Sequence, residues 1–164
     1  MNILEVKNLE TIFNTDEGTV HAVNGIDFDL KEGETLGIVG ESGCGKSVSM
    51  LSMLQLIPTP PGKVINGEAK FFGHDLLGMA EDEIRHIRGA QISMIFQDPM
   101  TSFNPVLTME RQITEPLQIH MNASRDKARE RAVEILSMTG IPNVEERIEN
   151  YPYQFSGGMR QRAM

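Results

Sequence analysis

The sequence has no tryptophan, a single cysteine and few aromatic residues, which make up 5% of its 164 positions. Cys44 has no partner for an internal disulfide, and such cysteine usage is typical of a reducing cytosol. No apolar run approaches the ~18 residues that are needed to span a bilayer, and the first ten residues lack the basic-then-apolar layout of a signal peptide. We therefore expect a cytoplasmic protein that reaches a membrane only through a partner protein.

Positive charge is also scarce, because 15 Lys and Arg stand against 23 Asp and Glu, giving a net charge of -8. An acidic surface repels phosphate backbones, so we expect no nucleic-acid partner. What remains is 40% hydrophobic and 23% charged, which is typical of a soluble globular protein. The length suffices for one domain with a substantial core.

Strands mixed with helices are predicted in the first part of the chain. Alternating apolar and polar residues predict a half-buried strand over Ile3–Leu9, and short apolar runs predict buried strands over Thr35–Val39 and Gln91–Gln97. Between these two runs, apolar residues at helical spacing follow Lys46 and stop before Pro58. This order is typical of an α/β fold.

Helical patterns replace the strands after Asp98-Pro99. The segment Ser124–Met138 is predicted to be a helix that begins at a serine N-cap and is followed by Gly140 and Pro142. Its expected buried face carries Ala128, Ala132, Ile135 and Leu136. We therefore place a boundary near Gln97, between residues 1–97 and a helical segment of residues 98–164.

A phosphate-binding loop is indicated by the run GESGCGKS, which fits the pattern G-x-x-x-x-G-K-[ST] between a predicted strand and a predicted helix. Glycines let successive backbone N–H groups point at a phosphate, and the helix adds the positive end of its dipole. Lys46 brings a cation to the β- and γ-phosphates, and the Ser47 hydroxyl can ligate Mg²⁺. The expected nucleotide-binding residues here are Gly40, Glu41, Ser42, Gly43, Cys44, Gly45, Lys46, Ser47 and Val48.

Plainer interpretations of the same residues exist. The loop could be a glycine-rich turn with a chance lysine, but the strand before it and the helix after it argue against that. Cys44 fits a small filler in the loop better than a redox or metal residue, since it has no cysteine partner, although a helix N-terminus favours a thiolate.

Two later segments narrow the class of nucleotide-binding protein. Gln97 ends a predicted strand, where ligands sit in open α/β sheets, and its amide could ligate Mg²⁺ and place an attacking water. Taken alone, such a glutamine is more often structural. The turn Ser156-Gly157-Gly158, followed by Met159, lies where a helix could begin. The backbone N–H groups of this turn could bind a second anion. In isolation, Ser156 would read as an ordinary N-cap.

Together, and in this order, GESGCGKS, FQDP and FSGGMRQR resemble the P-loop, glutamine loop and signature of ABC transporter ATPases. The segments MIFQDPMTSFNP and YPYQFSGGMRQRAM are similar to the corresponding segments in the ATP-binding subunits of oligopeptide and dipeptide importers. The resemblance runs from Leu4 to Met164. It implies an α/β P-loop NTPase core with an antiparallel β subdomain over residues 1–97, and an α-helical subdomain that ends in the signature over residues 98–164.

The resemblance also implies roles, partners and cofactors. Phe13 matches the aromatic position that stacks on adenine, unless it is a core residue. ATP and Mg²⁺ are the implied cofactors, with Lys46 and Gln97 catalytic, and Ser47 and Gln97 as metal ligands. Two subunits, identical or paralogous, pair head to tail, so that residues 156–159 of one contact the ATP held by Lys46 of the other. Permease subunits, docked near Met100–Val106, and indirectly an extracytoplasmic substrate-binding protein complete the transporter.

In this family the pattern continues with an apolar strand that ends in Asp-Glu, and the sequence stops at Met164 before it. The C-terminal part of the core, including the catalytic glutamate, is therefore expected to be missing here, and we expect negligible hydrolysis from this chain alone. The leading hypothesis is the ATPase subunit of a peptide importer, peripheral on the inner face of the cell membrane. The alternatives are a soluble ABC-type ATPase of DNA repair or chromosome architecture and a non-catalytic nucleotide-binding module.

Overall fold

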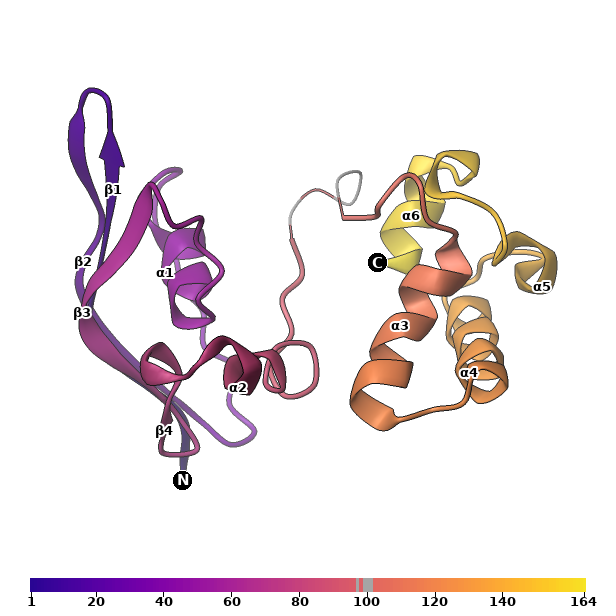
Figure 1. The fold of residues 1–164 in the computed structure, drawn as a ribbon, viewed down its shortest axis with the longest axis horizontal. Helices are drawn as coiled ribbons and strands as arrows, with labels where there is room; N and C mark the ends of the chain where they lie inside the picture. Colours follow the sequence, from indigo (N-terminus) through magenta and orange to yellow (C-terminus); the bar gives the residue numbers. More distant parts are fainter. Residues whose placement is uncertain (97, 99–101) are drawn as a thin grey trace. The chain divides into compact units, whose positions relative to one another are not determined.

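The computed structural model describes residues 1–96, 98 and 102–164, and these form two compact units, Met1–Ile84 and Arg85–Met164 (Figure 1). Each unit is described by itself. The expected boundary near Gln97 stays a prediction, and Gln97 itself lies outside the described residues.

A four-stranded antiparallel sheet dominates the first unit, with β1 at its centre and the strand order β2-β1-β3-β4. The strands are β1 (Asn2–Thr15), β2 (Gly18–Lys31), β3 (Gly62–Phe71) and β4 (His74–Asp75). β1 and β2 form the long hairpin of Figure 1. The predicted strand over Ile3–Leu9 is confirmed as part of β1, and β2 is one continuous strand.

One helix, α1 (Lys46–Met53), packs against β1 and β2. The buried residues of α1 are Ser49, Ser52 and Met53, so two of the three buried side chains are small and polar. At this interface the hydroxyl groups of Thr11 on β1 and Ser52 lie 2.8 Å apart in a buried hydrogen bond. The short helix η1 (Leu76–Gly78) and all but the last residue of α2 (Glu81–Arg85) complete the unit.

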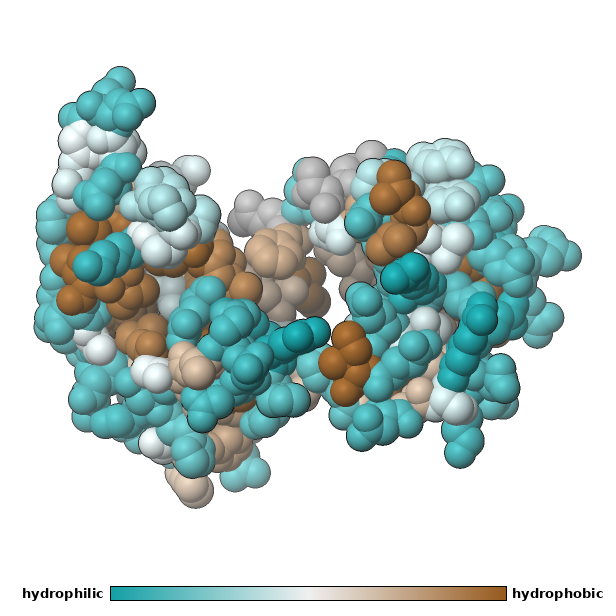
Figure 2. Space-filling model, viewed as in Figure 1, coloured by the Kyte–Doolittle hydropathy of each residue, from teal (hydrophilic) through white to brown (hydrophobic). Residues whose placement is uncertain are grey.

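The predicted buried strand over Thr35–Val39 is wrong for this structure. The segment is irregular, and 43% of Ile38 and 93% of Val39 are exposed. A strand needs a neighbour that accepts its N–H groups and donates to its carbonyls, and no described strand pairs with this segment. Figure 2 shows that apolar residues remain visible on the surface of the first unit.

The second predicted buried strand, over Gln91–Gln97, is not formed in its described part either. Apart from one isolated bridge between Arg88 and Ile92 the segment is irregular, and Ile95 and Phe96 are exposed. The apolar sequence is suited to a strand covered on both faces. Local sequence, however, cannot supply the neighbouring strands that such a segment needs.

Helices make up the second unit. They are α3 (Met109–Met121), α4 (Arg125–Met138), α5 (Val144–Arg147), η2 (Pro152–Gln154) and α6 (Gly157–Ala163). Their shared core consists of the buried residues Met109, Ala132, Leu136, Ile141, Val144, Ile148 and Phe155. Among the described residues, no helix combines the length and the apolar character that crossing a bilayer requires.

The predicted helix over Ser124–Met138 is confirmed as α4. The Ser124 hydroxyl caps it by accepting from the Lys127 amide, and Gly140 follows its end with φ +74°. Ala128, Ala132 and Leu136 are buried as predicted. Ile135 is the exception, because 37% of it is exposed. It lies at the edge of the apolar stripe, next to solvent.

We predict that Thr11→Val destabilises the protein by about 1–3 kcal/mol, since it leaves the buried Ser52 hydroxyl without its partner. The double variant Thr11→Val/Ser52→Ala should cost less than the sum of the two single changes, because both buried hydroxyl groups are then gone. Urea unfolding measures these differences.

Thr19→Val is the matched control, since Thr19 lies in the same hairpin but makes an exposed hydrogen bond to Asn14. Its cost should stay within about 0.5 kcal/mol. Equal costs for Thr11→Val and Thr19→Val would contradict the energetic role of the buried pair.

Candidate functional site

The predicted phosphate-binding loop curves around the side chain of Lys46, the first residue of α1. The Lys46 ammonium donates to the carbonyl oxygens of Gly40 at 2.8 Å and Glu41 at 2.6 Å, and it lies 3.5 Å from the Cys44 sulfur. The side chain is therefore folded back over the loop, with its charge near the start of the glycine-rich run. A phosphate that binds in this loop would have to replace these two carbonyl oxygens as the partner of the Lys46 ammonium.

The end of the loop lies against strand β2. Gly45, the N-cap of α1, has φ +94°, and a Cβ built there would lie 2.2 Å from the carbonyl oxygen of Ala22. Only glycine allows both this left-handed backbone and this close approach. The contact fixes the start of α1 on the sheet.

The first turn of α1 offers backbone N–H groups that have no acceptor within the helix. These amides belong to Lys46, Ser47 and Val48, and Ser47 is exposed. Behind them, Ser49 donates from both its amide and its hydroxyl to the carbonyl of Gly45, at 2.8 and 2.9 Å. This doubly bonded turn orients a helix terminus whose partial positive charge favours an anion.

Phe13 lies on β1 near the loop's support on β2. It pairs with Val20, two residues before Ala22, and it is half-buried. Its ring lies across Gly62 on β3, where a Cβ would come within 2.9 Å of the ring. Its other surroundings leave part of the ring accessible, so a stacking role toward adenine stays a prediction.

Other predicted site residues lie elsewhere. Gln97 lies outside the described residues, as do Met100 and Thr101 of the expected docking segment. Among the residues that the structure describes, no group of three or more His, Cys, Asp or Glu side chains could hold a metal ion. Mg²⁺ commonly keeps several water ligands and binds through few protein groups together with phosphate oxygens.

The predicted signature turn forms the start of α6 in the second unit. Ser156 is its N-cap, and its hydroxyl accepts from the Met159 amide at 3.3 Å. The Met159 side chain packs against the helical core, as does Ala163, and Phe155 just before the turn is buried. Gly157 and Gly158 are exposed, with no atoms within 4 Å of a built Cβ, so their backbone is open to a ligand.

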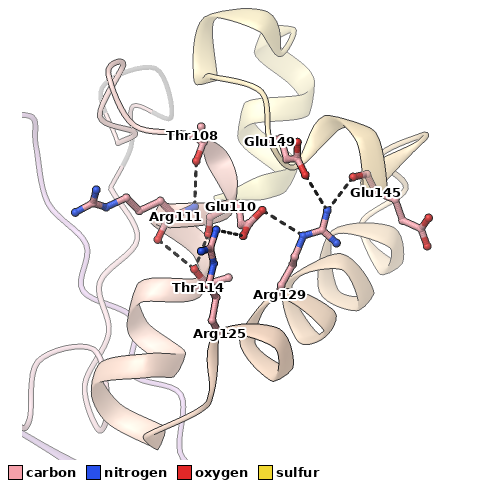
Figure 3. A network of polar contacts seen from close by, with 8 residues as sticks. All are labelled: Thr108, Glu110, Arg111, Thr114, Arg125, Arg129, Glu145 and Glu149. Carbon is pink, nitrogen blue, oxygen red and sulfur yellow. Dashed lines mark hydrogen bonds and ion pairs between the residues drawn. The ribbon is translucent and has the colours of Figure 1, made fainter.

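Sequence reasoning missed a polar network that joins three elements of the second unit (Figure 3). Arg129 on α4 donates to Glu110 on α3 at 3.3 Å, to the Glu145 carbonyl at 3.3 Å and to Glu149 at 3.2 Å. These partners are 16 to 20 residues away along the chain. No local pattern links positions so far apart, so charge along the sequence gave no signal for the network.

Comparisons with known proteins agree with these features. A family model described as ABC transporter matches residues 23–164. A probable peptide ABC transporter ATP-binding protein of Sinorhizobium fredii is 52% identical over 162 residues, covering 99% of this chain and 48% of that protein. An oligopeptide transport ATP-binding protein of Bacillus subtilis is 51% identical over 162 residues, covering 99% of this chain and 45% of that protein.

A solved dimeric ATP-binding cassette, in a post-hydrolysis state bound to ADP and Pi, superposes with a TM-score of 0.81 at 28% identity. The match covers 98% of this chain and 66% of that chain. The predicted P-loop NTPase fold class is thereby confirmed. The chain spans about half the length of the curated relatives that it matches.

We predict that Gly45→Ala is more destabilising than Gly43→Ala. Both glycines have positive φ, +94° and +82°, but only at Gly45 would the new Cβ meet a backbone carbonyl. Gly43→Ala should cost about 1–2 kcal/mol for the left-handed backbone, and Gly45→Ala about 1–3 kcal/mol more for the clash. Chemical unfolding of the two variants measures the difference, and equal values would argue against the close contact with Ala22.

Proposed function

Because this chain belongs to the ABC transporter family, we propose that it provides the ATP-binding region of the energy-coupling subunit of an importer. ATP binding closes a pair of such subunits, and hydrolysis by the full-length protein resets them. The observation that carries the proposal is the position of Lys46, whose ammonium lies 2.8 and 2.6 Å from two carbonyl oxygens of the loop, at the start of α1.

The loop's own residues have distinct tasks in this proposal. Lys46 exchanges its carbonyl partners for the β- and γ-phosphate oxygens, and the amides of residues 43–48 bind the remaining phosphate charge. Ser47 and Gln97 are the proposed protein ligands of Mg²⁺, which supplies further charge neutralisation when bound. Phe13, two positions along the sheet from the loop's support at Ala22, stacks on the adenine.

The Ser156 turn works on the nucleotide of a second subunit in this proposal. Its exposed Gly157 and Gly158 place backbone amides toward a γ-phosphate held by Lys46 of the partner. A dimer bound to ADP and Pi among the similar solved structures supports such a pairing. The second subunit is identical or paralogous.

The names of the similar proteins support peptide import. Relatives at 51–52% identity are called peptide and oligopeptide transport ATP-binding proteins. We therefore propose permease subunits as direct partners, an extracytoplasmic substrate-binding protein as an indirect one, and a location on the cytoplasmic face of the membrane. The alternatives, a DNA-repair ATPase or a non-catalytic module, find no support in these names. Copurification with membrane-embedded subunits tests this choice.

Lys46→Ala should weaken ATP binding by about 10- to 100-fold, because one charge-assisted contact to phosphate is worth about 1.5–3 kcal/mol. Titration of the 164-residue chain with a fluorescent ATP analogue measures the dissociation constant. The control is Lys7→Ala, which removes an exposed lysine of β1 and should leave the affinity unchanged. Equal affinities of wild type and Lys46→Ala would remove the P-loop assignment.

For a pair of identical subunits, we expect two inactive variants to complement each other. Lys46→Ala removes the cation, and Gly157→Asp sets a carboxylate against the γ-phosphate without steric conflict, since nothing lies within 4 Å of the new Cβ. A mixed dimer of full-length subunits keeps one intact site, so hydrolysis should return on mixing. Without such recovery, the signature would not act on the nucleotide of an identical partner.

A further inference from the structure

We propose that Arg129 is a positioning residue for the signature turn at Ser156, a role that rests on the proposed function of that turn. Gly157 and Gly158 at the turn are exposed, and α6, a short helix of 7 residues, contacts the core through Met159 and Ala163. The direction in which the turn presents its amides also depends on the segment that leads into it, and Arg129 binds the start of that segment.

The guanidinium of Arg129 joins three residues of the network in Figure 3, in which Glu110 also lies 3.9 Å from Arg125. Its Nε bonds to Glu110, whose side chain is only 14% exposed, and its second nitrogen reaches the Glu145 carbonyl and the Glu149 carboxylate. One planar group thus joins α4, the start of α3 and residues 145–149. Because the fork of an arginine fixes the directions of its partners, it sets the orientation of these elements relative to one another.

The start of α3 then holds the backbone that follows. The Glu110 amide donates to the Ile148 carbonyl at 2.7 Å, and the Met109 amide donates to the Asn150 carbonyl at 2.9 Å. These two bonds satisfy amides that α3 cannot satisfy itself. Glu110 therefore binds Arg129 through its side chain and residue 148 through its backbone, which couples the network directly to the chain before the turn.

Only five residues lie between Asn150, which accepts the second of these bonds, and Ser156. Local contacts hold this short segment. The Tyr151 amide donates to the side chain of Gln154 at 2.9 Å, the Gln154 amide donates back to the Tyr151 carbonyl at 2.9 Å, and Phe155 is buried. A shift of residues 148–150 would therefore be passed on to the turn.

Stability alone does not explain the network. The hydrophobic core of this unit already includes Met109, Leu136, Ile148 and Phe155, and the outer contact of Arg129 goes to Glu149, which is 69% exposed. Exposed ion pairs contribute little to the free energy of unfolding. The main effect of the network is to fix the orientation of the elements that Arg129 joins. Its loss should therefore change the geometry of the turn more than the stability of the unit.

Arg129→Ala in the full-length protein should lower kcat for ATP hydrolysis about tenfold or more, because small misplacements of a reacting geometry are costly. ATP affinity should stay within about twofold, since Lys46 belongs to the other unit. Arg129→Lys, which keeps the charge but not the fork, should fall between wild type and Arg129→Ala. ATP-driven association of subunits should weaken in the same order.

Arg131→Ala is the matched control, because Arg131 lies on the same helix and makes only an exposed ion pair with Glu134 at 2.6 Å. It should leave kcat unchanged. Amide hydrogen exchange in the 164-residue chain adds a local measurement: Arg129→Ala should speed exchange at Met109 and Glu110, and Arg131→Ala should not. Should Arg129→Ala fail to fold, Arg129→Lys, which keeps the positive charge, replaces it in the comparison and should still lower kcat.

The proposal is overturned if Arg129→Ala, or Arg129→Lys where Arg129→Ala does not fold, matches Arg131→Ala in kcat, or if ATP affinity falls in parallel with kcat. Failure of the proposed function looks different, because wild type itself would then neither bind nor hydrolyse ATP.

Discussion

The close approach of α1 to the hairpin β1–β2 is the constraint on which the first unit's loop depends. Gly45 lies against the Ala22 carbonyl, and about two helical turns further along the same face Ser52 bonds to Thr11. Both contacts require small side chains at the interface, and larger ones would lift the helix off the sheet. With α1 fixed at this distance, the loop before it must curve tightly, which brings the Lys46 ammonium over the carbonyls of residues 40 and 41.

A related solution appears in the second unit, where backbone and side-chain contacts again fix a helix start. The first amides of α3 bind the carbonyls of residues 148 and 150, while Arg129 ties the same end of α3 to α4 and to Glu149. In both units, then, the segment proposed to meet phosphate is short and exposed, and contacts of neighbouring elements hold it in place. Rigid support of an accessible loop is a general way of building binding sites.

The sequence predicted those parts of the molecule whose signals are local. The P-loop run, the Ser124 cap of α4 and the helix that begins after Ser156 are all encoded within a few residues, and the structure has each of these elements where expected. The predicted strands over Thr35–Val39 and Gln91–Gln97 failed because a strand needs a neighbour, and apolar residues alone cannot provide one. The burial of Ile135 was predicted wrongly for a similar reason, since which side of a helix is buried depends on what packs against it.

By itself, then, the sequence determined the family and the fold class, and it predicted the phosphate-binding residues, because glycine, lysine and serine at fixed spacing carry their chemistry in the local backbone. Tertiary structure alone decided that Ser52 bonds to Thr11, that Gly45 touches Ala22, and that Arg129 joins Glu110 to Glu149. These contacts link residues from 19 to 41 positions apart. Such pairs form only when chain folding brings distant elements together, and no short-range pattern in the sequence predicts these contacts.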